Sequence, residues 1–159
     1  MTTTQPDPSS QAQKNVQPKG NPAHMRVVIV TGDRTAYDGQ AEAVVAPATN
    51  GQIGIRPLHA PLLAGLEPGE LLVRANGEEQ VFAVSGGFIE VRDNQVIILA
   101  DTVERAEEID VARAEAARRR ARMLVERYRD RPEAIAARQA LDRSRARLRV
   151  AQRARRPSR

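Results

Sequence analysis

The stretch VIILADTVERAEEIDVARAEAA, residues 96–117, contains the change of pattern that decides the fold. Its first four residues form an unbroken apolar run, which is typical of a short β-strand. After Glu108 the pattern changes, and Ala114 begins a stripe whose members recur at the helical spacing of 3 and 4 residues. The sequence therefore predicts an α+β chain, with strands before this stretch and helices after it.

Upstream of residue 96 the chain has the pattern of short strands separated by turns. Four further apolar runs follow one another at short intervals, at Val27–Val30, Val44–Val45, Ile53 with Ile55, and Leu71–Val73. Residue pairs that supply the positive φ of tight hairpin turns lie between strands, at Asn50-Gly51, Asn76-Gly77 and Asp93-Asn94. Many short strands with frequent turns predict an antiparallel β-sandwich over residues 25–104.

The residues after 104 predict two helices joined by a short connector. The first stripe consists of Ala114, Ala117, Ala121, Leu124 and Tyr128, and the second of Ala137, Leu141, Ser144, Leu148 and Ala151. Asp130–Pro132 interrupts the pattern between the two stripes, so residues 105–159 are predicted to form an α-helical hairpin. Alanine buries little area, at roughly 0.8 kcal/mol per buried methylene, so the contact between these helices is predicted to be weak.

The formal net charge of +5 is unevenly distributed along the chain. Residues 25–108 hold 6 arginines against 13 acids, a charge of −7, whereas residues 109–159 hold 17 arginines against 6 acids, a charge of +11. A basic tail on an acidic body predicts attraction to an anionic partner, whether protein, phosphate or nucleic acid.

The N-terminal segment has a different composition from the rest of the chain. Residues 1–24 are rich in Thr, Gln, Pro and Ser and contain few large apolar side chains to offset the entropy of ordering, so we expect a disordered leader. This segment lacks the apolar core of a secretory signal. No apolar run approaches the roughly 20 residues that span a bilayer, so the sequence predicts a soluble, cytoplasmic protein.

No group of residues has the pattern of a catalytic or metal site. The chain has no cysteine, and its two histidines, His24 and His59, lie far apart in the sequence. Ser85-Gly86-Gly87 is not followed by the Gly-Lys-Ser/Thr of a phosphate-binding loop, and it predicts a bulge or a close approach of two backbones. The sequence therefore predicts a protein that is not an enzyme.

The arginines of the tail allow two interpretations. They recur in rows, with Arg113, Arg120 and Arg127 on the first helix and Arg143 and Arg147 on the second. One interpretation is a solvated basic face. The other is that several converge across the hairpin on a polyphosphate, because guanidinium forks match phosphate geometry. Nucleic acid would also suit a basic tail, but Tyr128 is the only aromatic residue after residue 108, so platforms for base stacking are lacking.

Three motifs resemble those of the epsilon subunits of bacterial F-type ATP synthases. The stretch Gly51-Gln-Ile-Gly-Ile-Arg-Pro-Leu-His-Ala-Pro-Leu-Leu63 resembles the family signature GxLGIxPxHAPL. Val84-Ser-Gly-Gly-Phe-Ile-Glu-Val91 resembles the SGGxxEV strand, and Ile98-Leu-Ala-Asp101 resembles the LAD that ends the sandwich. The resemblance covers residues 25–150, with the motifs in family order.

The resemblance implies an N-terminal β-sandwich, a C-terminal two-helix domain and a non-catalytic role in the central stalk. In this family the sandwich grips the gamma subunit and rests on the c-ring. The hairpin folds beside the sandwich or extends towards the alpha/beta head, where it inhibits ATP hydrolysis. The implied location is the cytoplasmic face of the bacterial plasma membrane, reached through the complex. The alternative from the residues alone is a nucleic-acid-binding adaptor, against which the sandwich motifs count.

The resemblance also implies two sets of site residues. Ile109-Asp110-Val111-Ala112-Arg113-Ala114 resembles the I/L-D-x-x-R-A motif by which some epsilon subunits bind ATP. The implied nucleotide-binding residues are Glu104, Ile109, Asp110, Arg113, Arg120, Arg143 and Arg147. No cofactor is required, and ATP is implied as a regulatory ligand. The implied rotor-interface residues, in loops that face the c-ring and gamma, are Thr31, Gln52 and His59. From spacing alone, Asp110 and Arg113 are expected to pair along the helix.

Overall fold

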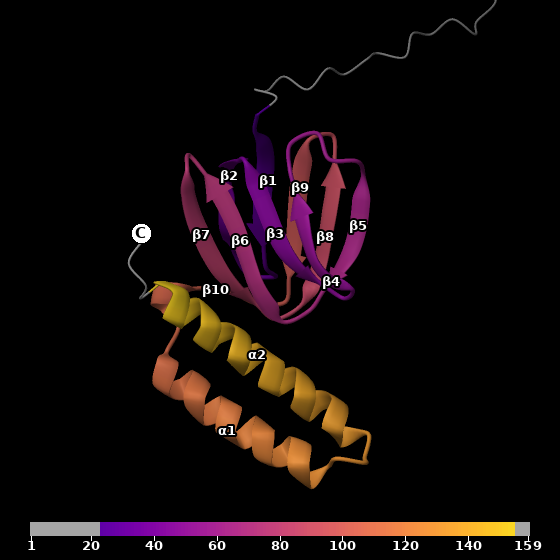
Figure 1. Cartoon of the computed structure of the whole chain (residues 1–159), viewed down its shortest axis with the longest axis vertical. Helices are drawn as coiled ribbons and strands as arrows, with labels where there is room; N and C mark the ends of the chain where they lie inside the picture. The colour runs from indigo at the N-terminus through magenta and orange to yellow at the C-terminus, as the bar shows by residue number, and fades with distance from the viewer. Residues whose placement is uncertain (1–22, 155–159) are drawn as a thin grey trace, which may run out of the picture.

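The computed structural model describes residues 23–154, which form a β-sandwich followed by a helical hairpin (Figure 1). Most of the predicted leader, residues 1–22, lies outside the described residues. The strands are β1 (Met25–Val30), β2 (Thr35–Ala41), β3 (Ala43–Ala48), β4 (Gly51–Ile55), β5 (Leu62–Leu66), β6 (Gly69–Ala75), β7 (Glu78–Val84), β8 (Gly87–Arg92), β9 (Gln95–Ala100) and β10 (Val103–Arg105). The helices are the 3₁₀ turn η1 (Ala106–Glu108), α1 (Val111–Arg127) and α2 (Glu133–Ala154).

The strands form one continuous sheet that folds over on itself. Their order is β10-β7-β6-β3-β5-β8-β9-β1-β2, with β4 pairing on β3. Arg105 Nη2 of β10 donates to the Ala36 carbonyl oxygen of β2 at 3.0 Å, so the two ends of the sheet meet. The predicted sandwich is confirmed, with one difference from an all-antiparallel sheet, because β1 and β9 pair in parallel.

Side chains alternate between the core and the surface along most strands, as the period of a pleated strand requires. The largest buried side chains are Phe82, Met25, Ile29, Ile55, Leu71, Ile89 and Ile98. Phe82 packs edge-on against Tyr37 with the ring centroids 6.3 Å apart. Burial of each large apolar side chain stabilises the fold by about 1.5–3 kcal/mol, so this core carries the sandwich.

Two of the three predicted turn pairs have positive φ at both residues, whereas at Asn50-Gly51 only Gly51 has it, with a φ of 112°. Asn76 and Gly77 both have positive φ, 54° and 76°, between β6 and β7, and so do Asp93 and Asn94 between β8 and β9. The predicted close approach at Ser85-Gly86-Gly87 is also confirmed. Gly87 has a φ of 124°, and a Cβ atom there would collide with the Leu99 carbonyl oxygen.

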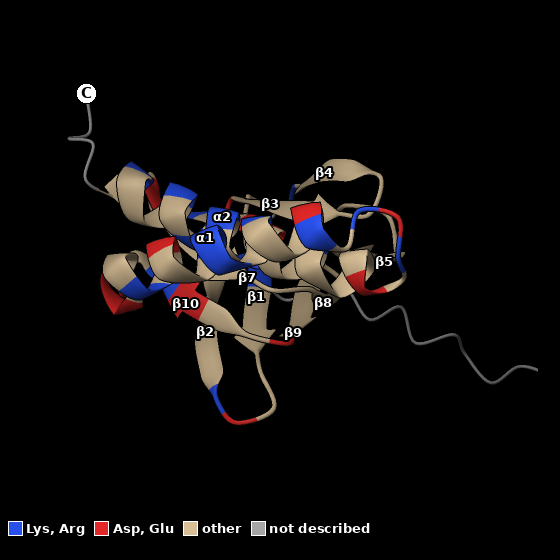
Figure 2. Ribbon diagram, turned by 90° about the horizontal axis from the view of Figure 1, so that it is seen from below, with Lys and Arg blue, Asp and Glu red and all other residues tan. Residues whose placement is uncertain are grey.

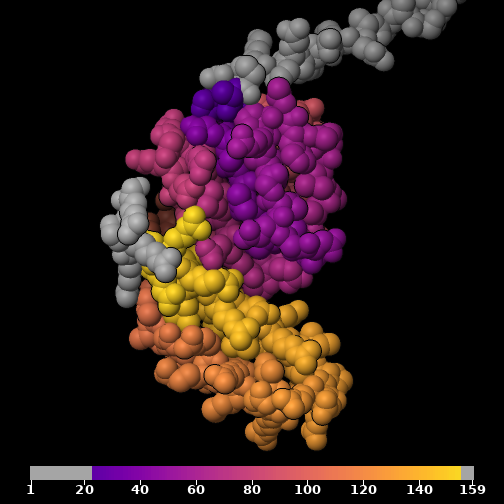
Figure 3. Space-filling model, viewed as in Figure 1, coloured from indigo at the N-terminus to yellow at the C-terminus, as the bar shows by residue number. Residues whose placement is uncertain are grey.

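The two helices form an antiparallel hairpin in which α2 lies between the sandwich and α1 (Figures 1 and 3). Every residue of the second predicted stripe is buried, whereas only Ala114 and Ala121 of the first are buried. Three exposed apolar side chains lie towards the connector end of the hairpin, Met123, Leu124 and Ile135. Among residues 23–154, no helix is long and apolar enough to cross a membrane.

A bidentate ion pair fastens the β1–β2 turn to the start of the hairpin. Arg34 Nη1 and Nη2 donate to Glu108 Oε1 and Oε2 at 2.8 and 3.0 Å. The Arg105 backbone N–H also donates to Glu108, at 2.7 Å. The hydrogen bonds from Arg34, and next that from Arg105, lower the pKa of Glu108 to about 2.

This depressed pKa predicts an acid-sensitive contribution to stability. Because the folded-state pKa lies below the unfolded value of 4.5, the contribution is fully present above about pH 4.5 and is lost as the pH falls towards 2. We expect Glu108→Gln to lower the unfolding free energy at pH 7 and to converge with the parent as the pH falls to about 2. Urea unfolding as a function of pH measures the difference. Glu126→Gln, at an exposed carboxylate 3.5 Å from Arg129, is the control. A constant difference between Glu108→Gln and the parent from pH 7 to 2 would contradict this assignment.

Candidate functional sites

Helix α2 rests on a sheet face that is apolar at its centre and acidic at its edges. Cross-strand pairing aligns Glu70 of β6, Ala83 of β7 and Glu104 of β10 in one row. Ala83 is buried in a small cluster beneath the hairpin with Ile109, Ala114, Leu148, Val150 and Ala151. Because the alanine is small, the helix approaches the sheet closely, and carboxylates lie on both sides of it.

Of the predicted nucleotide-binding residues, the structure pairs Glu104 with Arg147. The guanidinium of Arg147 lies 2.6 Å from Glu104 Oε1, and each side chain is 28% exposed. This pair crosses from β10 to α2 and flanks Ala83 on one side. Both side chains are partly shielded from solvent.

Ile109 and Asp110, at the start of the proposed ATP motif, have local structural roles. Ile109 is 8% exposed and packs in the cluster beneath the hairpin. Asp110 is the N-cap of α1, and its Oδ1 accepts the Arg113 backbone N–H at 2.9 Å. The prediction that the side chains of Asp110 and Arg113 pair is therefore wrong, because the Asp110 carboxylate accepts the backbone N–H of Arg113 instead.

The remaining three residues of this set keep their charged groups free of ion pairs with any residue in the range 23–154. Arg113 and Arg120 are exposed on α1, and Arg143 is half-buried on α2, one turn before Arg147. Basic residues, coloured blue on the ribbon, are spread along both helices (Figure 2). The seven predicted residues are thus divided among β10, the start and middle of α1, and α2, and Glu104 and Arg147 are the two that form an ion pair with each other.

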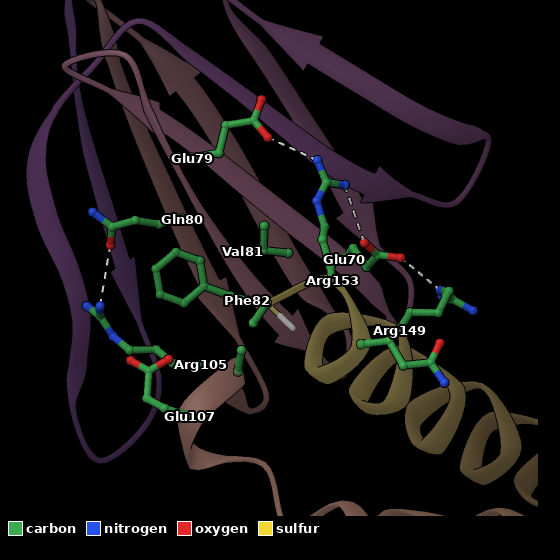
Figure 4. Close-up of a pocket in the computed structure, with 12 residues that line it drawn as sticks. Glu70, Glu79, Gln80, Val81, Phe82, Arg105, Glu107, Arg149 and Arg153 are labelled. Atoms are coloured by element: carbon green, nitrogen blue, oxygen red, sulfur yellow. Dashed lines mark hydrogen bonds and ion pairs between the residues drawn. The ribbon is translucent and has the colours of Figure 1, made fainter. Parts of the chain in front are cut away.

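A separate open cleft of about 850 Å³ lies at the C-terminal end of α2, between β6 and β7 on one side and the start of the 3₁₀ turn on the other (Figure 4). None of the predicted nucleotide-binding residues lines it. Its rim carries Glu70 and Glu79 from the sheet and Arg149 and Arg153 from the helix. Hydrogen bonds from Arg74 and then from Arg153 lower the pKa of Glu79. Sequence patterns did not identify this cluster, because its paired acids and arginines are up to 83 residues apart.

The predicted rotor residues lie at two ends of the sandwich. Thr31 is in the β1–β2 turn near the hairpin, where its hydroxyl donates to Asp33 Oδ1 at 2.6 Å. Gln52 is exposed on β4 opposite Pro47, towards the same end. His59 is exposed in the loop between β4 and β5, at the opposite end, and its Nδ1 lies 2.7 Å from the Ala60 carbonyl oxygen. The three residues therefore do not form one continuous patch.

The structure adds an exposed apolar surface that the sequence analysis did not assign. We call the outward side of β5, β8 and β9 the apolar face; its members are Leu63, Phe88, Ile97 and Leu99, which are 72%, 59%, 38% and 54% exposed. Phe88 pairs with Leu99, and the neighbouring Glu90 pairs with both Leu63 and Ile97. The unbroken run Val96–Leu99 was the available signal, because a strand with only one buried face alternates instead. Gathered apolar exposure of this kind marks an interaction site.

Comparison with known proteins gives the same family for both domains. Residues 24–106 match the model of the beta-sandwich domain of the ATP synthase delta/epsilon chain, and residues 107–152 match its long alpha-helix domain. The chain is 55% identical over 97 residues to the ATP synthase epsilon chain of Chloroflexus aurantiacus, covering 61% of this chain and 68% of that protein. It is 45% identical over 119 residues to that of Laribacter hongkongensis, covering 74% and 85%.

Solved structures agree with the sequence relatives. A chain in the cryo-EM structure of the Euglena gracilis mitochondrial ATP synthase (OSCP/F1/c-ring, rotational state 1) superposes with a TM-score of 0.72. It is 26% identical, and the match covers 84% of this chain and 85% of that one. The epsilon chains to which this chain is similar are stalk subunits and are not themselves catalytic. The chain belongs to the ATP synthase delta/epsilon chain family.

Proposed function

We propose that this chain couples the rotor of a proton-translocating F-type ATP synthase to its catalytic head and restrains ATP hydrolysis through its C-terminal helices. The observation that carries the proposal is the way the hairpin rests on the sandwich. Its apolar contact is small, centred on Ala83, and most of its remaining contacts are exposed or half-exposed ion pairs. Such a contact is strong enough to form and weak enough to be exchanged for another partner.

The sandwich supplies the proposed rotor contacts. The apolar face is suited to a permanent partner, because exposed Leu63 and Phe88 would be covered there. We assign the gamma subunit to it. Gln52 and Thr31 at one end and His59 at the other are assigned to contacts with the c-ring and with gamma. Through these partners the chain would lie on the cytoplasmic face of the bacterial plasma membrane as a peripheral subunit.

The hairpin is the part of the chain that we propose inhibits ATP hydrolysis, and we call this inhibition the brake. An extended hairpin would lose the small cluster around Ala83 and gain attraction between its arginines and acidic segments of the alpha/beta head. Charged contacts at the surface are individually weak and screened by salt. The folded and extended states would then differ by a few kcal/mol, which is within reach of a ligand.

Regulatory ATP is the ligand that we assign to the folded state. Arg113, Arg120 and Arg143 have free guanidinium groups among the described residues, which suits them to phosphate oxygens. Arg147, one turn from Arg143 on α2, is held by Glu104. Binding only to the folded hairpin would stabilise that state, and extension would disperse the arginines.

Contacts with the rotor can be separated by two substitutions. We expect Leu63→Asp to abolish capture by isolated gamma, because it introduces a charge into the apolar face. We expect Gln52→Asp to weaken only capture by a gamma–c-ring complex. Gln40→Asp, at an exposed position on β2, is the control. Unchanged capture of Leu63→Asp in a pull-down would remove the assignment of gamma to the apolar face.

The nucleotide assignment predicts a shift in stability. At a hundredfold excess of ATP over its dissociation constant, the folded chain should gain about 2.7 kcal/mol. Arg113→Ala should remove most of that gain, whereas Arg122→Ala, outside the set, should keep it. Thermal unfolding and calorimetry measure both effects. If millimolar ATP produces no heat of binding and no shift in the melting temperature, ATP is not a ligand of this chain.

The brake predicts the effect of removing the helices. Deletion of residues 109–159 keeps Glu108 and its pair with Arg34, so the sandwich should still assemble into a coupled enzyme. ATP hydrolysis by that enzyme should be faster, with each 1.4 kcal/mol of lost inhibition giving about a tenfold relief. Proton pumping in vesicles confirms coupling in the same preparation. Equal hydrolysis rates for the truncated and intact enzymes would mean that the hairpin is no brake.

A further inference from the structure

The arginines of α2 fall into two rows on different sides of the helix. At about 100° per residue, Arg143 and Arg147 are about 40° apart, and so are Arg149 and Arg153. Arg147 and Arg149 are about 200° apart, so the two rows flank the helix on opposite sides. The first row belongs to the predicted nucleotide-binding residues (Glu104, Ile109, Asp110, Arg113, Arg120, Arg143 and Arg147), which we call the nucleotide set. The second row contacts the carboxylates at the cleft (Figure 4).

The second row makes a connected set of ion pairs with β6 and β7. Arg149 Nε donates to Glu70 Oε1 at 3.0 Å. Arg153 bridges two strands, with Nη2 3.0 Å from Glu79 Oε2 and Nη1 3.7 Å from Glu70 Oε2. Arg74 of β6 holds Glu79 from the other side at 2.6 Å. Each carboxylate therefore has two cationic partners, which fixes its position for the helix.

The position of the acids follows from the pleat of the two strands. Glu70 and Arg74 lie on one side of β6, and cross-strand pairing places Ala83 and Glu79 beside them on β7. The opposite sides of these strands carry core residues such as Leu71 and Phe82. The acids are thus presented on the face that α2 covers. The pleat therefore fixes the face from which both side chains start.

We infer that Glu70, Glu79, Arg149 and Arg153 form an ionic latch that holds the end of α2 on the sandwich, and that salt or a competing acidic protein segment opens it. Single exposed pairs contribute little, but this connected set acts beside an apolar contact that is itself small. The arginine side chains are 51% and 47% exposed and border an open cleft, so dissolved ions reach them. The N–H groups that Arg149 and Arg153 direct at Glu70 and Glu79 are not available to another carboxylate at the same time.

The role of the latch in regulation rests on the proposed function, whereas the latch itself does not. If the arginines of the second row attract an acidic segment of the head, the latch competes directly with that contact. The latch then sets how readily the hairpin leaves the sandwich. It acts at a different place from the nucleotide set, so it operates with or without ATP.

The latch is tested on the full chain in solution, by the distance between two labels. The chain contains no cysteine, so Ala60→Cys and Gln139→Cys, both exposed, give unique labels on the sandwich and on α2. We expect Glu70→Gln with Glu79→Gln to raise the ratio of undocked to docked hairpin about tenfold at low salt. Raising salt from about 0.01 M to about 1 M, which shortens the Debye length from about 30 Å to about 3 Å, should undock the parent and affect this variant less.

Two further variants separate the latch from general damage. Arg145→Gln removes an α2 arginine that pairs only with Asp142 on its own helix among the described residues, so docking should be unchanged. Glu70→Arg should undock the hairpin, and adding Arg149→Glu should restore docking by reversing the pair. A distance distribution in Glu70→Gln with Glu79→Gln that matches the parent at every salt concentration would overturn the latch, and so would a failure of Arg149→Glu to rescue.

The outcome is distinguishable from a failure of the proposed function. If the latch variants undock the hairpin but removal of the hairpin leaves ATP hydrolysis unchanged, the latch is supported and inhibition by the hairpin is contradicted. If truncation raises the rate of ATP hydrolysis but the latch variants leave the hairpin docked, inhibition by the hairpin is supported and the latch is contradicted.

Discussion

Ala83 lies at the centre of the sheet face that carries helix α2, with Glu70 and Glu104 beside it on the neighbouring strands. The small side chain lets the helix approach, and the two carboxylates receive arginines from its opposite sides. A larger residue at this position would lift the helix and lengthen both ion pairs. The placement of the hairpin therefore depends on one small residue between two acids, and the candidate nucleotide set and the latch both follow from it.

The chemistry of this contact explains why the hairpin is suited to movement. A large apolar interface would hold the helices permanently, because burial is not screened by salt and has no alternative charged partner. Here the apolar part is a cluster of small and medium side chains, and the charged part can be matched by other carboxylates. If the hairpin is released as proposed, the same arginines would stabilise either state, depending on which acids they meet.

The sequence predicted the elements well because strands, tight turns and helices leave local signals. Asn76-Gly77 and Asp93-Asn94 have the positive φ expected of them, and the second helical stripe is buried throughout. The sequence predicted contacts between side chains less well. Glu70 and Arg149 are 79 residues apart, and no local pattern indicates that they meet. Asp110 and Arg113 have the spacing of a side-chain pair, but an aspartate just before a helix satisfies the backbone N–H first.

The arrangement of charges on α2 also bears on how two signals would act together. Arg147 meets Glu104 on one side of the helix, and Arg149 and Arg153 meet Glu70 and Glu79 on the other. A ligand on the first side and ions on the second would stabilise or weaken the same docked state without sharing a contact. Because the two sides share no side-chain contact, we expect their contributions to the docking free energy to be close to additive. Nucleotide would shift the salt concentration at which the hairpin leaves, and would not remove the salt dependence itself.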